Sequence, residues 1–513
     1  MKRTLLVCLT LLCVTTFALA KSYTQQGIAY LYDYKTKTKK PIGNVSLNVA
    51  YAQPTASKAD GTFTLEFADF GAGKRLTFTQ QPFSPGLTVL NKKETDNWST
   101  FEGRLTLIMC SKKDFDTCKQ NYYDVGFKSI SQRYDQKIAA LKKESADYQR
   151  RLQELEEERD RIMDNLRNSA DAMARIDQSE LDDAMQEVLD LYECGEVEEA
   201  MQKLEDMKLE EKFLKTLDKK HEGERIVAEA TEDSLLTLNK LRTSVDMYKN
   251  NGNWDKAAET LKLLADKLNT IDDVYTYAYF CYGQNDFNES ETYCRKALGM
   301  LEKRMDTDSN DFLYQRATLL NNLALLYSNT QRFTESEKMY MEALEIRRRL
   351  AKDNPKAYEP DVAGTLNNLA GLYYNTQRFT ESEKMYMEAL EIYRRLAKDN
   401  PKAYEPYVAA TLNGLAILYS DTQRFTESEK MYMEALEIYQ RLAKDNPKAY
   451  EQDVAGTLNN LAILYKNTQR FTESEKIYKE ALEIYKRLAI DNTLKYKPKV
   501  ERLEQLLNKQ KNL

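Results

Sequence analysis

A repeat of 46 residues constrains this chain more than any other feature of its sequence. The segment LNNLALLYSNTQRFTESEKMYMEALEI begins at Leu320 and returns almost unchanged at Leu366, Leu412 and Leu458. A period of about 20 to 50 residues is typical of stacked supersecondary units, because one unit is too small to bury its own apolar face. Neighbouring copies must therefore share one core. Such chains usually bind other molecules rather than transform them, so we expect a binding protein.

Each copy has the pattern of two antiparallel helices. At about 3.6 residues per turn, one face of the first helix carries large and small apolar residues: Leu320, Leu323, Ala324 and Tyr327. On the second helix, small residues at Ser336 and Ala343 allow the two helices to approach closely. The sequence from Thr334 to Glu337 has capping-box spacing and predicts the start of the second helix, which Pro355 ends.

The repeat resembles a known family in three phrases. LNNLA-x-LY, SEK-x-Y-x-EALEI, and DNP followed by VA-x-TLN are similar to the extended tetratricopeptide repeats of kinesin light chain and its bacterial relatives. The resemblance is clear over about 200 residues, and over about 330 with degenerate copies included. It implies a groove that holds an extended peptide. Two departures are an inter-repeat loop without the family's histidine, and glutamines at the usual turn glycine: Gln331, Gln377, Gln423 and Gln469.

The resemblance also identifies candidate peptide-binding residues, because residues 321, 325 and 328 correspond to positions on the concave side of the family's superhelix. All four copies have an asparagine at the first of these positions: Asn321, Asn367, Asn413 and Asn459. An amide can donate and accept hydrogen bonds at once, as a peptide backbone requires, and the family uses such asparagines. The alternative is that these side chains brace the repeats locally.

The other two positions differ between copies. The second holds Leu325, Gly371, Ile417 and Ile463, and the third holds Ser328, Tyr374, Ser420 and Lys466. The run TQRFTESEKMYMEALEI is meanwhile identical in three copies. Two interpretations are open: drift at solvent-facing positions, or tuning of a binding surface on a fixed scaffold. The second makes these six residues candidate contacts: Leu325, Ser328, Tyr374, Ile417, Ser420 and Lys466.

Residues 1–20 have the features of a secretory signal peptide. Basic residues precede an apolar stretch, which ends at Ala18-Leu19-Ala20. This stretch is shorter than the roughly 20 apolar residues of a membrane anchor. We therefore expect export to the periplasm or the exterior of a bacterial cell, without a transmembrane segment in the remaining chain.

Residues 21–112 have a strand-like pattern and predict a small antiparallel β-sandwich. The expected strands are 28–32, 45–49, 63–67, 76–78 and 105–108, and Asp60-Gly61 predicts a hairpin turn with positive φ. The phrases PIGNVSL and SKADGTFTL resemble the carboxypeptidase regulatory-like, transthyretin-type sandwich of secreted bacterial proteins. In that family the sandwich is a non-catalytic companion domain.

A heptad pattern follows in residues 113–178. Apolar residues alternate by three and four positions over about six heptads, but polar residues interrupt the seam at Ser145, Arg159 and Ser169. Two structures fit this pattern: a helical stalk that forms a homodimer through residues 129–178, or a long helix folded onto its neighbours.

Degenerate copies of the repeat occupy residues 179–305. Each has a turn followed by an apolar anchor, at Val197, Trp254 or Phe287. The four extended units then span residues 306–495, and residues 496–513 predict an amphipathic helix that caps the last copy. The predicted architecture is thus multidomain: a β-sandwich, a coiled-coil-like stalk and an all-α superhelix.

Few residues are available for catalysis or metal binding. The one histidine, His221, lies in a polar run, and no CxxC, HExxH, GxSxG or Walker A pattern is present. We expect no enzyme activity, no metal and no cofactor. Cys110 and Cys118 flank a short polar loop, and either form a disulfide in an oxidising compartment or are two unrelated thiols. Cys281 and Cys294 are expected to fill the core of one degenerate copy.

Two hypotheses for the function follow. The formal charge is −6, with acidic and basic residues interleaved, which argues against nucleic acid as a partner. The leading hypothesis is a non-catalytic scaffold of the cell envelope whose repeat groove binds a peptide segment of a protein partner. The alternative is a structural protein that dimerises through the helical stalk while the β-sandwich attaches to a surface or a carbohydrate.

Overall fold

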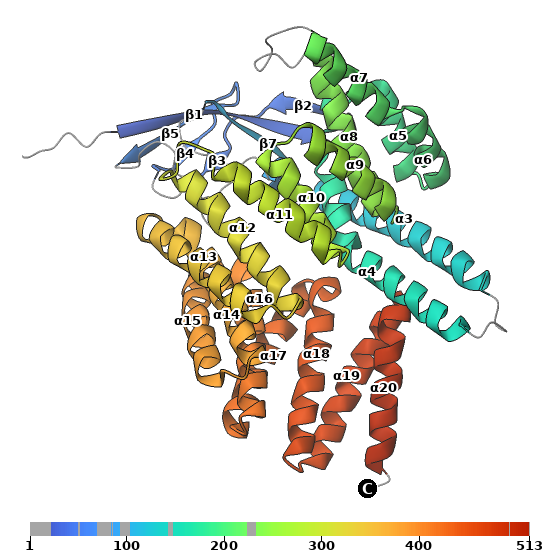
Figure 1. Cartoon of the computed structure of the whole chain (residues 1–513), viewed down its shortest axis with the longest axis vertical. Coiled ribbons are helices and arrows are strands. Elements are labelled where there is room, and N and C mark those ends of the chain that lie inside the picture. The colour runs from blue at the N-terminus through green and yellow to red at the C-terminus, as the bar shows by residue number, and fades with distance from the viewer. Residues whose placement is uncertain are drawn as a thin grey trace, which may run out of the picture. The chain divides into compact units, whose positions relative to one another are not determined.

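The structure is a computed structural model that describes residues 22–49, 52–68, 84, 86–92, 103–141, 147–222, 232–491 and 493–511 (Figure 1). The expected signal peptide and the expected strand at 76–78 lie outside these residues. The chain divides into two compact units. The first comprises residues 1–125, 170–246 and 309–311, and the second comprises residues 126–169, 247–308 and 312–513.

A small mixed β-sheet forms the N-terminal part of the first unit. Its strands are β1 (Ser22–Asp33), β2 (Thr38–Pro41), β5 (Thr62–Ala68), β6 (Leu87–Val89) and β7 (Leu105–Ser111). β2, β1, β7 and β6 are neighbours in this order, and β5 pairs with the first half of β1. A separate antiparallel pair consists of β3 (Ser46–Leu47) and β4 (Thr55–Ala56).

The expectation of a purely antiparallel sandwich is wrong at one pairing. β1 and β7 run parallel, with Gly27 opposite Leu105 and Leu31 opposite Met109. An alternating pattern predicts which face of a strand is buried, but it does not predict the direction of the neighbouring strand. Strands are present where they were expected at 28–32, 63–67 and 105–108, and the one expected at 45–49 contracts to β3.

Both sheets contribute to one apolar core. Its buried residues are Ala29, Val45, Leu47, Val49, Phe63, Leu65, Phe67, Leu105, Leu107 and Met109. The turn before β5 has the expected conformation, because Gly61 has a φ of 78° and Asp60 Oδ1 accepts a hydrogen bond from the backbone N–H of Thr62 at 3.0 Å. This turn brings β5 back against β1.

Cys110 and Cys118 do not flank a loop. Cys110 lies near the end of β7, and Cys118 lies in the first turns of α3 (Lys112–Ala139), which begins directly after the strand. Both are free thiols in this structure. Burial raises the pKa of Cys110 to about 11 and the pKa of Cys118 to about 12. Little reactive thiolate is therefore present near neutral pH, and a disulfide between them stays a prediction.

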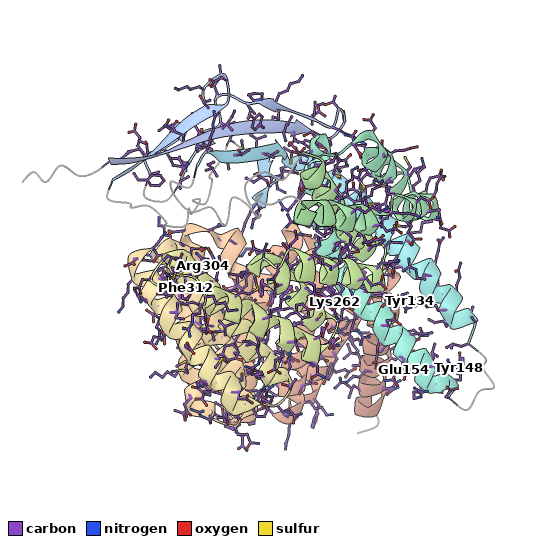
Figure 2. All side chains as sticks on the ribbon, turned by 45° about the horizontal axis from the view of Figure 1, so that its top comes forward. Tyr134, Tyr148, Glu154, Lys262, Arg304 and Phe312 are labelled. Atoms are coloured by element: carbon purple, nitrogen blue, oxygen red, sulfur yellow. The ribbon has the colours of Figure 1, made fainter. Side chains whose placement is uncertain are left out.

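The heptad region forms two packed helices. α3 and α4 (Tyr148–Ala174) run antiparallel; Figure 2 labels Tyr134 on α3 and Tyr148 and Glu154 on α4. Tyr134 Oη donates a hydrogen bond to Glu158 Oε1 on α4 at 2.6 Å. Ile162 of the expected seam is 3% exposed, and a Cβ placed on Gly252 would lie 3.3 Å from it. The seam is thus used inside the chain, as in the folded-back alternative. A homodimer through residues 129–178 stays a prediction.

Shorter helices follow: α5 (Asp183–Glu193), α6 (Val197–Asp206), α7 (Leu209–Glu222), α8 (Glu232–Asn250), α9 (Trp254–Lys267), α10 (Ile271–Gly283) and α11 (Phe287–Leu301). The three expected anchors, Val197, Trp254 and Phe287, each begin a helix. Two residues before each anchor the backbone is left-handed, at Gly195, Gly252 and Asn285.

In the second unit, Cys281 and Cys294 are buried at 4% and 3% exposed, as expected for residues that fill a core.

The regular repeats form a continuous array in the second unit. Its helices are α12 (Asn310–Asn329), α13 (Phe333–Asp353), α14 (Pro355–Asn375), α15 (Phe379–Asp399), α16 (Pro401–Asp421), α17 (Phe425–Asp445), α18 (Pro447–Asn467), α19 (Phe471–Asp491) and α20 (Thr493–Lys511). From α13 to α20 each helix packs against the next, and α13 contacts α12 through Ser336 and Ala324 (Figure 1). One core runs through all copies, and α20 completes it with Leu503 and Leu507, as expected of a capping helix.

The predicted capping box at the start of the second helix is wrong. The N-cap of α13 is Arg332 and makes no side-chain cap bond. Gln331, with a φ of 59°, turns the chain just before it. Of the two residues predicted to form the box, Thr334 lies inside the first turn of α13, and Glu337 accepts hydrogen bonds from Tyr373 and Arg378 of the next copy. Between them, Ser336 Oγ donates to the carbonyl of Ala324 on α12 at 2.7 Å and joins the two helices of a copy.

The expected inter-repeat loop is also absent. Asn354 alone separates α13 from α14, and Pro355 is the first residue of the new helix. A proline is well suited to this position, because the N–H that it lacks would have no intrahelical partner there. Asn354 Oδ1 accepts a hydrogen bond from the N–H of Ala357 at 3.3 Å and caps α14. The second helix of one copy thus passes directly into the first helix of the next.

A three-residue contact connects each copy to the preceding one. Arg378 lies over the ring of Tyr373, 4.1 Å from its centroid, and donates from Nη1 to Glu337 Oε2 of the previous copy at 2.7 Å. Tyr373 Oη donates to the same carboxylate at 2.9 Å. Equivalent sets are Glu291, Tyr327 and Arg332; Glu383, Tyr419 and Arg424; and Glu429, Tyr465 and Arg470. Each set combines a cation–π contact with an ion pair.

The left-handed glutamines give a first test of this fold. Gln377 has a φ of 59°, and a left-handed backbone costs a residue with a Cβ about 1 to 2 kcal/mol. We expect Gln377→Gly to raise the free energy of unfolding by about 0.5 to 1 kcal/mol after the entropy of the unfolded chain is counted. Gln440→Gly, an exposed change inside α17, should lower it by a similar amount. Thermal unfolding of the two variants checks this, and a destabilised Gln377→Gly would contradict the turn assignment.

Candidate functional site

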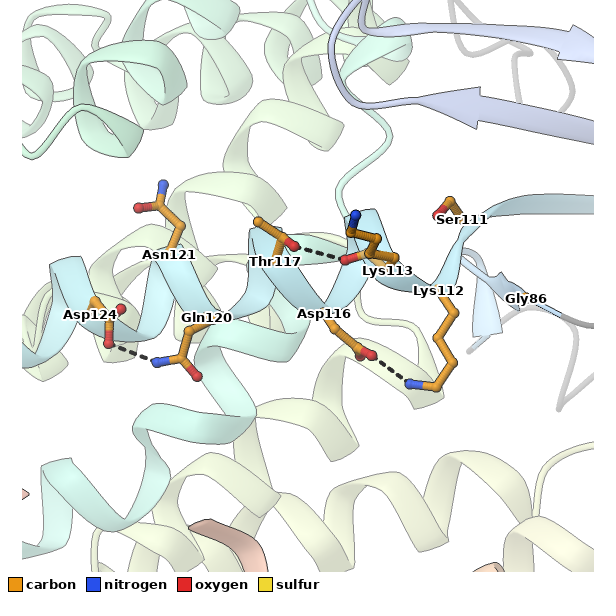
Figure 3. A pocket seen from close by; sticks show the side chains of 9 residues that line it. All are labelled: Gly86, Ser111, Lys112, Lys113, Asp116, Thr117, Gln120, Asn121 and Asp124. Atoms are coloured by element: carbon orange, nitrogen blue, oxygen red, sulfur yellow. Dashed lines mark hydrogen bonds and ion pairs between the residues drawn. The ribbon is translucent and has the colours of Figure 1, made fainter. Parts of the chain in front are cut away.

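An open depression of about 930 Å³ lies along one face of α3 (Figure 3). Its polar side chains bond to one another. Lys112 Nζ pairs with Asp116 at 2.6 Å, and Gln120 Nε2 donates to Asp124 at 2.7 Å. Lining residues contain neither histidine nor cysteine. This depression is a solvated helix face and not a candidate site.

The candidate binding residues lie on the first helix of each regular copy, on a surface that we name the helix-A face. It comprises residues 321, 325 and 328 of α12 and their equivalents, 46 residues apart, on α14, α16 and α18. On the same helices, residues such as Leu320 and Leu323 are 2% exposed and face the core. The core positions are thus fixed by packing, and the helix-A face lies to one side of them.

The asparagines of the helix-A face connect neighbouring copies. Thr411 Oγ1 lies 3.2 Å from Asn367 Oδ1 and 2.8 Å from the carbonyl of Tyr407, so its one hydroxyl hydrogen is shared between these two acceptors. Asn413 Nδ2 donates to Thr457 Oγ1 at 2.9 Å. Each threonine is 1% exposed. The bracing alternative therefore accounts for the contacts of both asparagines within the chain, and a contact with a ligand stays a prediction.

The first and last asparagines depart from this scheme. Asn321 Oδ1 lies 3.5 Å from Nη1 of Arg347, a 6% exposed guanidinium whose Nη1 also donates to Thr365 Oγ1 at 2.5 Å. Arg347 thus links the first copy to the second. Asn459 belongs to the last copy, and its one described hydrogen bond is to Asn460 Oδ1 at 3.5 Å. The residue 44 positions after it is Leu503 of the cap α20, where the earlier copies have Thr411 and Thr457.

The variable positions stay accessible to solvent. Five of the candidates are half-buried, and Lys466 is exposed: the five are Leu325, Ser328, Tyr374, Ile417 and Ser420. Tyr374 donates its hydroxyl hydrogen to the carboxylate of Asp421 on α16. The helix-A face therefore differs in chemistry from copy to copy, while the copies keep one backbone.

Three further tyrosines on α10 lie at equivalent positions, one copy earlier: Tyr275, Tyr279 and Tyr282. Tyr282 Oη accepts a hydrogen bond from Asn329 Nδ2 at 2.6 Å, and Tyr279 is 62% exposed. A small cavity of about 20 Å³ lies among these tyrosines, Ser290, Cys294 and residues of α12. These tyrosines were not predicted from the sequence, although a step of 46 residues back from Asn321 leads to Tyr275.

The site has the chemistry of a binding surface. Amides, hydroxyls, aliphatic side chains and few charges lie along the helix-A face. Within the described ranges no three histidine, cysteine, aspartate or glutamate residues are arranged to hold a metal ion. In the same part of the chain, no helix has both the length and the hydropathy needed to cross a bilayer.

Comparison with known families identifies the repeat. Tetratricopeptide repeat models match residues 361–441, and also residues 316–355 and 454–489. The regular copies are therefore tetratricopeptide repeats, and the chain is a mostly helical repeat protein with a small N-terminal β region. None of the curated proteins compared with this chain matches it.

Solved structures give weaker similarities. BtubC (BKLC) from P. vanneervenii is 25% identical, with 49% of this chain and 92% of that chain covered at a TM-score of 0.37. RapI in its apo form is 18% identical. The match covers 63% of this chain and 80% of that chain, at a TM-score of 0.40. Aspartyl phosphate phosphatase F from Bacillus subtilis is 11% identical. The match covers 76% of this chain and 94% of that chain, at a TM-score of 0.36. At these TM-scores the similarities carry no functional argument.

The bracing role of the buried threonines can be measured. We expect Thr411→Val to lower the free energy of unfolding by about 1 to 2 kcal/mol, because it removes a buried hydroxyl and leaves Asn367 without its partner. Thr380→Val, the same change at an exposed position of α15, should alter it by less than about 0.5 kcal/mol. Chemical denaturation of both variants checks this, and equal effects would show that the hydroxyl of Thr411 does not brace the copies.

Proposed function

We propose that this chain is a non-catalytic protein-interaction scaffold whose helix-A face binds an extended segment of a protein partner. One observation carries the proposal: near-identical copies keep their core residues, while residues 325 and 328 and their equivalents vary and remain open to solvent. The stack itself does not require different side chains at residues 325 and 328 of each copy, whereas a binding surface that contacts different groups of a partner does.

The tetratricopeptide repeat matches support a binding role, because arrays of this kind present an extended surface to a partner. Half-buried side chains such as Leu325 and Ile417 offer apolar area, and the adjacent amides and hydroxyls offer hydrogen bonds. A peptide in extended conformation exposes both kinds of group along its length. The helix-A face therefore has suitable chemistry for the side chains and the backbone of such a peptide.

The proposal includes a location in the cell envelope. Its support is the sequence of residues 1–20, with a basic start, an apolar stretch and small residues at Ala18 and Ala20. Export would expose the helix-A face to proteins of the envelope. The partner is therefore sought in an envelope extract.

A capture experiment tests the binding face. Ser328→Arg with Ser420→Arg places bulky guanidinium groups on the helix-A face of two copies. We expect this variant to retain less than about a tenth of the partner that immobilised wild-type chain captures from envelope extract, since an ill-fitting side chain at a packed interface costs more than about 1.4 kcal/mol.

The matched control places the same side chains elsewhere. Met387 and Met433, on helices α15 and α17, are 49% and 50% exposed, and Met387→Arg with Met433→Arg should leave capture within about twofold of wild type. Circular dichroism establishes that both variants are folded. Equal capture by the two variants would show that the helix-A face is not the binding surface.

A further inference from the structure

Four of the differences between the copies lie at one place, the junction of α14, α15 and α16. Residue 371 is glycine where the other copies have leucine or isoleucine, and residue 374 is tyrosine where they have serine or lysine. Residue 414 is glycine and residue 421 is aspartate, and at both positions the other copies have asparagine. Other departures lie elsewhere in the array, such as Arg347, Lys466 and Lys479, but these four come together on the neighbouring helices α14 and α16.

Two of these departures uncover a tyrosine. A Cβ on Gly414 would lie 2.8 Å from the ring of Tyr386, and a Cβ on Gly371 would lie 3.9 Å from its hydroxyl. An asparagine at residue 414 would collide with this ring, and a branched side chain at residue 371 would cover the hydroxyl. Tyr386 is accordingly 9% exposed, whereas its equivalents are less so, with Tyr340 at 1%, Tyr432 at 3% and Tyr478 at 1%.

Tyr386 keeps an unused hydrogen-bond donor beside the helix-A face. Its hydroxyl makes no hydrogen bond with any residue that the structure describes, and burial raises its pKa, so the phenol stays protonated. With no side chain on Gly371, another backbone can approach α14 closely. A peptide carbonyl that crosses Gly371 can thus accept the hydrogen of Tyr386.

The other two departures provide a carboxylate next to an aromatic ring. Tyr374 donates its hydroxyl hydrogen to Asp421, and burial together with this bond raises the pKa of Tyr374 to about 12. Asp421 is exposed, and no lysine or arginine pairs with it in the described part of the chain. An exposed carboxylate without a cation, beside tyrosine rings, suits a basic ligand group.

We propose that Gly371, Tyr374, Tyr386, Gly414 and Asp421 form a subsite, which we name the glycine niche, for an arginine or lysine side chain of an extended peptide. The proposal rests on the proposed function and specifies the peptide. Arginine suits the niche best, because its planar guanidinium can donate two hydrogen bonds to Asp421 and lie over the ring of Tyr374. An acidic side chain would meet the charge of Asp421 and be disfavoured.

A library of random dodecapeptides displayed on phage, selected on the full immobilised chain, tests the niche. We expect the selected sequences to share an arginine or lysine at one position. A synthetic dodecapeptide of the most frequent sequence is then titrated against wild type and variants by fluorescence polarisation.

Two variants remove features of the niche. Each introduces a residue that other copies already have at the equivalent position, so both variants are expected to fold. Gly371→Ile closes the approach to Tyr386 and should weaken binding about tenfold or more, as expected when backbone access to a site is blocked. Asp421→Asn should weaken binding about fivefold and reduce its dependence on salt. Asp399→Asn, an equal change of charge at an exposed position of α15, should leave the dissociation constant within about twofold.

The outcomes separate this inference from the function on which it rests. If no peptide is selected by the wild-type chain, the proposed function fails. If peptides are selected without an excess of basic residues, or bind the Gly371→Ile and Asp421→Asn variants as tightly as wild type, the glycine niche is wrong and peptide binding stands.

Discussion

The close approach of two helices at small residues is the contact on which the array depends. Ala324, Ser336 and Ala343 are 0% exposed, and Ser336 donates to the Ala324 carbonyl across the helix pair. A larger side chain at any of these positions would push the two helices apart and leave a gap that the core residues are too small to fill. With this spacing set, the large residues at Leu323, Tyr340 and their equivalents pack between consecutive helices, and each copy buries its apolar face only against its neighbours.

The same spacing decides which residues are free to vary. Core positions recur in every copy because a change of even one methylene group in a packed interior affects stability. The helix-A face borders this core without belonging to it, so residues such as Gly371 and Asp421 can differ between copies while the backbone is kept. Binding specificity on a repeat scaffold can therefore be concentrated in one junction without a loss of the array.

Periodicity made the array predictable from the sequence, because the 46-residue step, the apolar spacing and the small residues all describe local packing. The relative direction of paired strands and the contacts between side chains of different copies were not predictable in this way. The parallel pairing of β1 with β7 joins strands far apart in the chain, and the contact of Asn367 with Thr411 depends on how one copy rotates onto the next. The N-cap of α13 is Arg332, because the preceding residue, Gln331, has a left-handed backbone conformation. A capping-box pattern does not predict this conformation. For the candidate site, sequence spacing found the variable face but not Tyr386, which only the paired glycines uncover.

We propose that the ligand binds along the first helices of the copies, with Tyr386 contributed by the second helix α15, while the second helices otherwise hold the stack. Hydrogen–deuterium exchange of the full chain, measured by mass spectrometry with and without the selected dodecapeptide, tests it most directly. We expect the peptide to slow exchange in segments of α14 and α16 around residues 371 and 414, and to leave α17 and the β region at 22–68 unchanged. Slower exchange on α17 or in the β region, with none on α14 and α16, would contradict it.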